Sequence, residues 1–302
     1  MPFPVYLIYH RNCPDGLAAS WVYLHCHKTR GLGTDHITLI PADAGKVPTN
    51  LSWKDHNVVM LDISFKKDDL LRIASEAANI FIIDHHQTAQ TDLSGEFPEN
   101  VFLTFDMSKC GAQLAWDKWF PGRDYPWFID VIADRDLWLW KNPHSKAIGR
   151  YFSEYGYFDS HDKFEELLTW NGNDIDRSVE IGNVLLETDQ KIVKLYTKSA
   201  ILCDFKTPEK TYKVYLTGCP HQYASEVGHS LSSKSECDFA VMWRYSFSED
   251  EWQLSCRSSK DRPDIDLSVI CSKFGSGGGH KQAAGFTLKN SEANLHSYLT
   301  KV

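Results

Sequence analysis

The sequence has no long hydrophobic run, no closely spaced pair of cysteines and no excess of basic residues. Its apolar runs reach about 4 to 6 residues, far short of the roughly 20 that a membrane-spanning helix needs, so we expect no membrane partner. No basic leader precedes the first apolar stretch, so no secretion signal is predicted. The eight cysteines stand singly, which indicates reduced thiols in a cytoplasmic protein rather than a zinc knuckle or a set of disulfides.

Positive charge is also scarce. The 32 Lys and Arg residues are outnumbered by 40 Asp and Glu residues, which gives a net charge of −8. Binding to a long nucleic-acid duplex relies on Lys and Arg displacing condensed counterions, so this balance argues against such a partner. A small anionic substrate in a local pocket is compatible with it, and bound cations can neutralise part of an acidic excess.

The first half of the chain alternates apolar strands with amphipathic helices. Continuous apolar runs occupy residues 5–9, 57–61, 80–83 and 101–105, and helix-like segments lie between them. Continuous rather than alternating apolar strands are typical of a parallel sheet that is buried on both faces. We therefore expect an α/β fold with a parallel-sheet N-terminal domain over residues 1–157.

The pattern changes after this domain. Residues 158–203 are rich in Glu, Asp and Lys with helical spacing, and we interpret them as a helical connector. From residue 204 to 302, strand-like and helix-like segments alternate again, and a glycine-rich turn at 275–285 leads into a last strand. The sequence therefore predicts a second, smaller α/β domain.

Carboxylate and imidazole side chains follow three of the predicted strands, at the edge where parallel sheets bind ligands. They are His10 and Asp15 after the first strand, Asp62 after the second, and Asp84, His85 and His86 after the third. A single Asp at such a place is more often a helix cap or a turn residue, but three such strand ends weaken that interpretation. Carboxylates favour Mn²⁺ or Mg²⁺, and added imidazoles favour Mn²⁺, Co²⁺, Fe²⁺ or Zn²⁺. The cluster suits a two-metal site bridged by Asp62.

Five stretches in this order carry a family resemblance: "HRNCPDGLAAS", "LDIS", "DHH", "IADRDLW" and "GGGHKQAAG". Together they resemble the DHH phosphoesterase superfamily with a C-terminal DHHA1 domain. The match spans nearly the whole chain. The stretches "NCPDG" and "ADRDLW" are similar to the branch described as oligoribonucleases or cyclic-nucleotide phosphodiesterases.

The resemblance implies a role for each matching residue. It implies that Mn²⁺, as one or two ions and with Mg²⁺ or Co²⁺ as alternatives, is bound by His10, Asp15, Asp62, His85 and Asp134. Asp136 is the alternative to Asp134 within "ADRD". His86 is implied to lie close to the scissile phosphate, and Asp84 to orient the adjacent loop and histidine.

The second domain is expected to bind the substrate phosphate. Consecutive glycines allow successive backbone N–H groups to turn toward a phosphate. Arg257 resembles the family's phosphate-binding arginine, and an exposed arginine at a strand end is the alternative. The expected phosphate-binding residues are Arg257, Gly277, Gly278, Gly279 and His280.

One position departs from the family pattern. Many relatives carry Asp-x-Asp in the first motif, whereas Cys13 stands two residues before Asp15 here. Four interpretations remain open: His10 compensates, Cys13 ligates as thiolate, Asp43 substitutes, or the first ion binds weakly. A small buried residue in a turn is the structural alternative for Cys13.

The expected function is a divalent-metal-dependent phosphodiesterase that hydrolyses short oligonucleotides or cyclic (di)nucleotides with metal-activated water. The alternatives are an exopolyphosphatase, an adenosine bisphosphate phosphatase and a catalytically silent nucleotide-binding protein. Both monomer and homodimer are compatible with the sequence. Trp138 and Trp140, after "ADRD", are expected to pack in a core rather than to border the substrate.

Overall fold

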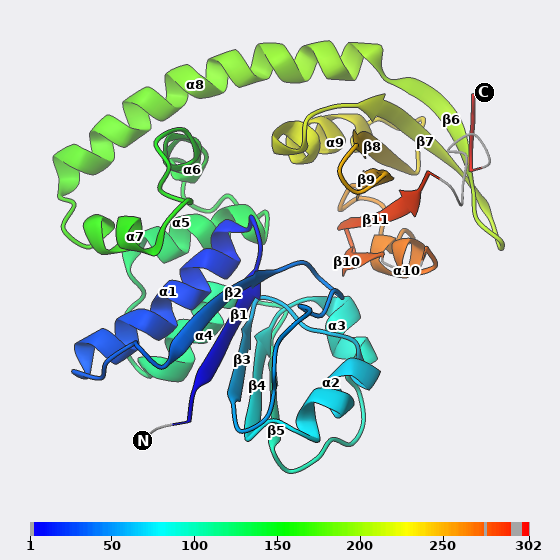
Figure 1. The fold of residues 1–302 in the computed structure, drawn as a ribbon. Coiled ribbons are helices and arrows are strands. Elements are labelled where there is room, and N and C mark those ends of the chain that lie inside the picture. Colours follow the sequence, from blue (N-terminus) through cyan, green and yellow to red (C-terminus); the bar gives the residue numbers. More distant parts are fainter. Residues whose placement is uncertain (1–2, 275–276, 291–297, 302) are drawn as a thin grey trace. The chain divides into compact units, whose positions relative to one another are not determined.

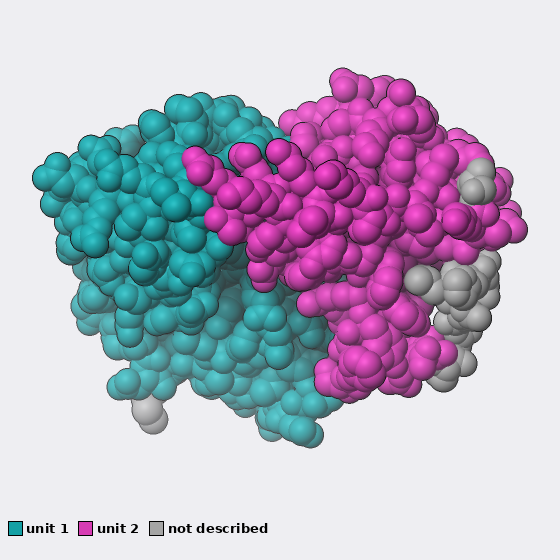
Figure 2. Space-filling view, turned by 90° about the horizontal axis from the view of Figure 1, so that it is seen from above, with its two compact units in different colours: residues 1–186 teal, residues 187–302 magenta. Residues whose placement is uncertain are grey.

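A computed structural model describes residues 3–274, 277–290 and 298–301 (Figure 1). The chain forms two compact units, residues 1–186 and 187–302, which are coloured separately in Figure 2. The boundary between them falls inside the long helix α8 (Gly172–Ser199). None of the described helices combines the length and apolar character that a bilayer crossing requires.

Unit 1 contains a five-stranded sheet whose strand order is β2-β1-β3-β4-β5. Every neighbouring pair of these strands is parallel, which confirms the expected α/β class with a parallel N-terminal sheet. The strands are β1 (Val5–His10), β2 (Ile37–Ala42), β3 (Asn57–Leu61), β4 (Asn79–Asp84) and β5 (Val101–Phe105). The sequence prediction missed β2, an edge strand that contains Pro41, because its apolar run is short and only one of its six residues is buried.

Helices cover both faces of this sheet (Figure 1). The helices that precede α8 in unit 1 are α1 (Pro14–Thr29), α2 (Lys67–Ala74), α3 (Gln87–Asp92), α4 (Gly111–Trp119), α5 (Trp127–Asp136), α6 (Ser145–Glu154) and α7 (His161–Leu167). Leu7 packs with α1 and α4 in one hydrophobic cluster, whereas its neighbour Ile8 packs with α2 in another. Both side chains are fully buried. Successive strand residues point to opposite faces, so a strand covered on both sides must be apolar at every position.

The region expected to be a connector contributes to unit 1. Phe164 and Leu167 of α7 are fully buried in the same cluster as Leu7. Ile175 and Val179, in the first half of α8, pack against that cluster as well. The second half of α8 belongs to unit 2, where Val193 and Tyr196 pack against α9 (Ala224–Ser232).

Unit 2 is built on a seven-stranded mixed sheet with the order β10-β11-β9-β8-β7-β6-β12. The strands are β6 (Ile201–Lys206), β7 (Thr211–Gly218), β8 (Phe239–Ser246), β9 (Glu251–Arg257), β10 (Gly278–His280), β11 (Ala283–Lys289) and β12 (Leu299–Lys301). Only β7 and β8 pair in parallel among these described strands. The short helix η1 (His221–Tyr223) contacts α9, and α9 packs against β8 and β9. Helix α10 (Leu267–Ser272) packs against β10 and β11.

The glycine-rich segment forms a strand rather than only a turn. Gly278 and His280 belong to β10, which pairs with β11 in antiparallel register. Gly275 and Ser276, at the start of the segment, lie outside the described residues. A Cβ atom at Gly277 would overlap the carbonyl oxygen of Cys271 in α10, so close packing requires glycine at that position.

A glycine in α8 yields a stability prediction. A Cβ atom at Gly182 would overlap the backbone carbonyl of Ala147 in α6. We expect Gly182→Ala to destabilise unit 1 by about 1–3 kcal/mol, because the two helix backbones would have to separate. Gly172→Ala is the matched control, since nothing lies within 4 Å of a Cβ atom at this first residue of the same helix. Differential scanning calorimetry should show a lower transition temperature for Gly182→Ala alone; equal temperatures for both variants would contradict the packing.

Candidate metal centre

Asp62, immediately after β3, lies at the centre of the polar cluster. Its side chain is 1% exposed. Nε2 of His85 donates a hydrogen bond to Oδ1 of Asp62 over 3.0 Å, and Nδ1 of His10 lies 3.4 Å from Oδ2. Asp62 has a φ of +58°, in the left-handed region that few residues other than glycine adopt. Such strain persists where the surroundings fix it and is concentrated at functional sites.

The structure brings most of the predicted ligands together around Asp62. One set of donor atoms within 4.8 Å of one another comes from His10, Cys13 and Asp62. Another such set comes from Asp15, Asp62 and His85. A third comes from Asp62, Asp84 and His86. Asp62 therefore belongs to three adjoining donor sets, each of which mixes a carboxylate with imidazole.

Asp15 is held by the start of α4, a contact that sequence analysis missed. Its Oδ2 accepts a hydrogen bond from the amide of Gly111 (2.5 Å), and its Oδ1 accepts one from Ala112 (2.8 Å). A Cβ atom at Gly111 would lie 2.7 Å from Cβ of Asp62 and 2.9 Å from Oδ2 of Asp15. Only glycine at position 111 lets α4 approach this closely. The amides at the N-terminus of α4 stabilise the carboxylate of Asp15. The signal in the sequence was the glycine at the start of a predicted helix.

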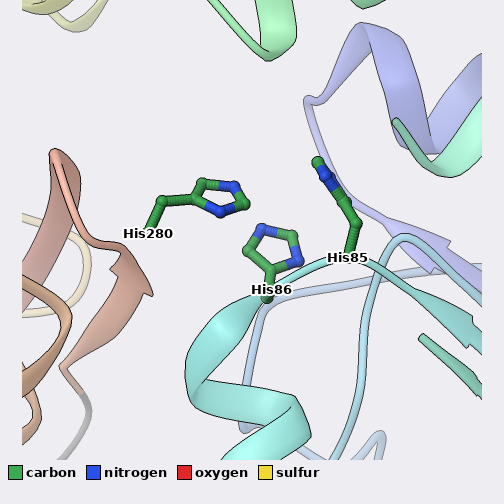
Figure 3. Close-up of side chains that lie close together, drawn as sticks. All are labelled: His85, His86 and His280. Atoms are coloured by element: carbon green, nitrogen blue, oxygen red, sulfur yellow. The ribbon is translucent and has the colours of Figure 1, made fainter. Parts of the chain in front are cut away.

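Asp84 fixes the two histidines that follow it. Its Oδ1 accepts hydrogen bonds from the amides of His85 (2.7 Å) and His86 (3.2 Å) and from Nδ1 of His86 (2.7 Å). Its Oδ2 accepts one from the hydroxyl of Ser64 (2.6 Å), a residue of "LDIS" that the sequence analysis did not single out. Figure 3 shows the imidazoles of His85 and His86 projecting from one short segment between β4 and α3. Asp84 is thus engaged in orienting its neighbours.

The electrostatics of the cluster reflect like charges that are buried together. Burial and the negative charges of Asp62 and Asp136 raise the pKa of Asp15 to about 8. Burial acts to lower the pKa of His85, but its hydrogen bond to Asp62 and the charge of Asp136 outweigh burial and raise it to about 10. Burial would raise the pKa of Asp62, yet the imidazoles of His10 and His85 hold it well below its ordinary value. A proton on Asp15 and another on His85 thus offset the negative charge that is buried in the cluster.

A divalent cation fits this donor set. Nδ1 of His10, Oδ2 of Asp62 and Oδ2 of Asp136 are buried and make no hydrogen bond within the described ranges. Buried polar atoms that make no hydrogen bond are costly, so three of them in one place call for a ligand. Carboxylate oxygens with imidazole nitrogens suit Mn²⁺ or a similar ion, which would take the place of the protons.

Cys13 lies at the edge of the cluster as the residue that precedes α1. It is partly exposed, and its sulfur is in one donor set with His10 and Asp62. Burial and the charge of Asp62 raise the pKa of its thiol well above the ordinary value. Asp43 was the alternative ligand in place of the aspartate that Cys13 replaces. At the surface it pairs with Arg11 (3.6 Å) and Lys46 (4.0 Å).

The two acids of "ADRD" have different environments. Asp134 accepts hydrogen bonds from the amides of Lys141 (3.1 Å) and Asn142 (2.8 Å) and from the hydroxyl of Ser145 (2.8 Å). Its carboxylate therefore caps the turn that follows α5. Oδ2 of Asp136 instead lies 3.4 Å from Nε2 of His85, beside the donor sets. The structure brings Asp136, and not the first-choice ligand Asp134, to the cluster, because residues two apart on a helix face different directions.

Arg257 in unit 2 is anchored within its own unit. It donates hydrogen bonds to the carbonyl of Cys256 (2.8 Å) and to the hydroxyl of Ser225 in α9 (3.1 Å). A Cβ atom at Gly228 would lie 2.6 Å from Cγ of Arg257, so a glycine in α9 makes room for the arginine stem. Burial lowers the pKa of the guanidinium from its ordinary value. Sequence analysis did not identify Ser225 or Gly228, which act through tertiary contacts alone.

The glycine segment has one backbone feature that requires glycine. Gly279 has a φ of +131°, and a Cβ atom there would lie 2.7 Å from the carbonyl oxygen of Ala283. His280 follows it at the end of β10 and is labelled in Figure 3. Gly278 pairs with Gly285 of β11.

Comparison with known proteins identifies a relative by sequence. No protein-family model matches the chain. The uncharacterized protein R106 of Acanthamoeba polyphaga mimivirus is 32% identical over 293 residues, which cover 93% of this chain and 67% of R106. The chain belongs to the R106 family.

Solved structures establish the fold. The crystal structure of RecJ in complex with Mn²⁺ from Thermus thermophilus matches with a TM-score of 0.51 and 14% identity, over 95% of this chain and 50% of the RecJ chain. This chain thus spans half the length of that RecJ. The pGpG-specific phosphodiesterase PggH of Vibrio cholerae matches with a TM-score of 0.42 and 14% identity, over 95% and 94% of the two chains. RecJ is a DHH-superfamily protein, and this chain has the DHH fold that its motifs implied.

The contrast between Asp134 and Asp136 can be tested by metal binding. We expect Asp136→Asn to weaken Mn²⁺ binding by at least about tenfold, since even groups that only support a ligand are worth 10- to 100-fold. Asp134→Asn should keep the Mn²⁺ affinity within the same order of magnitude and lower the melting temperature, because it disturbs the turn after α5. Isothermal titration calorimetry with Mn²⁺ separates the two. Loss of binding in Asp134→Asn with retention in Asp136→Asn would restore Asp134 as the ligand.

Proposed function

We propose that this protein is a divalent-metal-dependent phosphodiesterase that hydrolyses short oligonucleotides or cyclic (di)nucleotides. The observation that carries the proposal is that buried Asp62 is shared by adjoining donor sets, one with His10 and Cys13 and another with Asp15 and His85. A carboxylate shared by two ions is typical of sites that hold metals about 3.5–4 Å apart for phosphoryl chemistry. The fold shared with a RecJ whose crystal structure contains Mn²⁺ supports the choice of ion.

We assign the ligands from the geometry of unit 1. His10, Cys13 and Asp62 would hold one ion, and Asp15, Asp62, His85 and Asp136 would hold the other. Bound ions of this kind polarise phosphoryl oxygens and lower the pKa of a bound water molecule. This assignment uses Asp136 instead of Asp134, because the carboxylate oxygens of Asp134 accept hydrogen bonds from the turn after α5.

Other side chains bind and orient the phosphodiester. Asp84 holds Nδ1 of His86 at 2.7 Å, which fixes the ring so that its opposite edge can meet a phosphate oxygen. In unit 2, the anchored guanidinium of Arg257 is assigned to a substrate phosphate, because arginine binds phosphate through parallel N–H groups. We also assign phosphate binding to the backbone of Gly277, Gly278 and Gly279 and to His280. Hydrogen-bond donors fixed in advance stabilise the charge that develops in the transition state.

Activity is tested with a substrate panel in Mn²⁺. The panel contains linear dinucleotides, cyclic dinucleotides, cyclic mononucleotides, adenosine bisphosphate and polyphosphate. We expect turnover of the nucleotide diesters. Preference for polyphosphate or adenosine bisphosphate would favour the corresponding alternative enzyme, and nucleotide binding without any product would identify a silent binding protein.

The residue test is Asp62→Ala. Removing the shared carboxylate should lower kcat by at least about 10²–10³-fold, comparable to the loss of a principal stabilising group in other enzymes. The fold should persist, as judged by circular dichroism, because Asp62 follows the end of β3 and does not belong to the hydrophobic clusters that pack the sheet. Asp43→Ala is the matched control, since it removes a half-exposed surface acid that pairs with Arg11. Full activity in Asp62→Ala would refute the proposed function.

Cys13→Asp tests the departure from the family pattern. A protonated thiol is a weak ligand, and burial together with the negative charge of Asp62 raises the pKa of the Cys13 thiol. We therefore expect Cys13→Asp to tighten Mn²⁺ binding and to raise the rate, by titration calorimetry and by turnover. The control Cys13→Ser keeps the size without the charge and should show neither gain. Unchanged affinity and rate in Cys13→Asp would mean that His10 already completes the site.

A further inference from the structure

Trp138 and Trp140 differ from the other tryptophans of the chain. Eight of the ten tryptophans belong to or pack against the hydrophobic clusters of the described residues: Trp21, Trp53, Trp116, Trp119, Trp127, Trp170, Trp243 and Trp252. Trp138 and Trp140 belong to none of these clusters, and both are partly exposed. The sequence predicted core packing for these two side chains, whereas the structure places them outside the hydrophobic clusters.

The two residues stand in an unusual backbone conformation. Both have a φ of +54°, in the left-handed region that bulky side chains rarely adopt. Their rings form an edge-to-face pair with centroids 4.9 Å apart and an interplanar angle of 73°. Strain of this kind costs about 1–3 kcal/mol per residue and persists only where the surroundings impose it.

Asp134 imposes this conformation. Its two oxygens accept hydrogen bonds from Lys141, Asn142 and Ser145, and its backbone carbonyl accepts one from the amide of Leu139 (2.9 Å). The segment that carries both tryptophans is thus closed at each end by one buried residue. A rigid aromatic surface binds without first losing conformational freedom.

The chemistry of this turn suits a nucleotide. Nζ of Lys146 lies 4.6 Å from the ring centroid of Trp140. Lys146 is exposed and makes no ion pair with any residue that the structure describes. Nε1 of Trp140 is buried and has no hydrogen-bond partner within the described part of the chain. The turn therefore combines aromatic faces, an unused donor and a cation, which match a flat base and an anionic phosphate.

The turn is also close to the metal centre. Trp138 is two residues beyond Asp136, whose Oδ2 lies 3.4 Å from Nε2 of His85. Two residues of chain span at most about 7 Å. A substrate at the metal centre therefore has its neighbouring groups within reach of this turn.

We propose that the turn formed by residues 137–145 binds a nucleobase of the substrate by stacking on Trp138 or Trp140, with Lys146 pairing a phosphate. The inference rests on the proposed phosphodiesterase function and specifies its substrate class. Polyphosphate has no base to stack, so this surface favours nucleotides over polyphosphate.

The test measures how much a nucleobase of the ligand contributes to its binding affinity. The affinity of diadenylate and of its abasic analogue is measured by isothermal titration calorimetry in Ca²⁺, after checking that the dinucleotide stays intact. In the wild-type protein we expect loss of the base to weaken binding about 5- to 150-fold, the range for stacking one base on an aromatic side chain. In Trp138→Leu/Trp140→Leu the two ligands should bind within about threefold of each other. Leucine, like tryptophan, is not branched at Cβ, so it does not add the strain that a β-branched residue would add at positive φ.

Two further variants make the comparison specific. Trp138→Phe/Trp140→Phe keeps aromatic faces and should retain part of the base effect. Phe247→Leu removes an aromatic ring that is 91% exposed in the hairpin between β8 and β9, and should retain all of it. An equal base effect in wild type and in the double leucine variant would overturn the inference, and so would failure of diadenylate to bind.

The outcomes also distinguish this inference from the proposed function. Hydrolysis of polyphosphate without base-dependent binding would leave a metal-dependent phosphoesterase and remove the nucleobase site. Base-dependent binding that the double leucine variant loses, without hydrolysis of any substrate, would keep the nucleobase site and remove the enzyme.

Discussion

Burial of several carboxylates beside one another is the constraint that shapes unit 1. Taking an ionised carboxylate out of water costs several kcal/mol, and like charges at short range add to that cost. The structure offsets the cost locally, with imidazoles around Asp62 and with helix amides on Asp15. The raised pKa of Asp15 shows that these groups do not offset it fully. A divalent cation would complete the balance, and the proposed metal site therefore has the same electrostatic basis as the acid cluster.

The parallel sheet makes this cluster possible. His10 ends β1, and Asp62 and His85 directly follow β3 and β4, the next strands in the sheet. The hydrophobic residues before them are buried on both faces of the sheet. The strands are thereby fixed in position, and their ends are fixed with them. Glycine at Gly111 then allows a helix start to reach the carboxylates, at a distance that any side chain would prevent. Rigid strands and one close helix approach together hold charges that would otherwise move apart.

The sequence could predict what depends on local pattern. Continuous apolar strands predicted the parallel sheet, and polar residues at their ends predicted the grouping of Asp15, Asp62 and His85. Contacts between distant segments could not be predicted in this way. The amide of Gly111 reaches Asp15 across 96 residues, and no periodicity records that distance. The choice between Asp134 and Asp136 likewise depends on the turn closed by Lys141 and Ser145, which no motif specifies.

The end of α5 connects the metal centre with the aromatic turn. Asp134 and Asp136 are two residues apart, so their side chains leave the helix in different directions. Asp134 anchors the segment that carries Trp138 and Trp140. Asp136 lies against His85. A shift of this helix end would displace both surfaces at once. The metal centre and the aromatic surface are therefore fixed relative to each other by a single short element. The orientation of the two tryptophans thus depends on the same hydrogen bonds that hold Asp134 apart from the donor sets around Asp62.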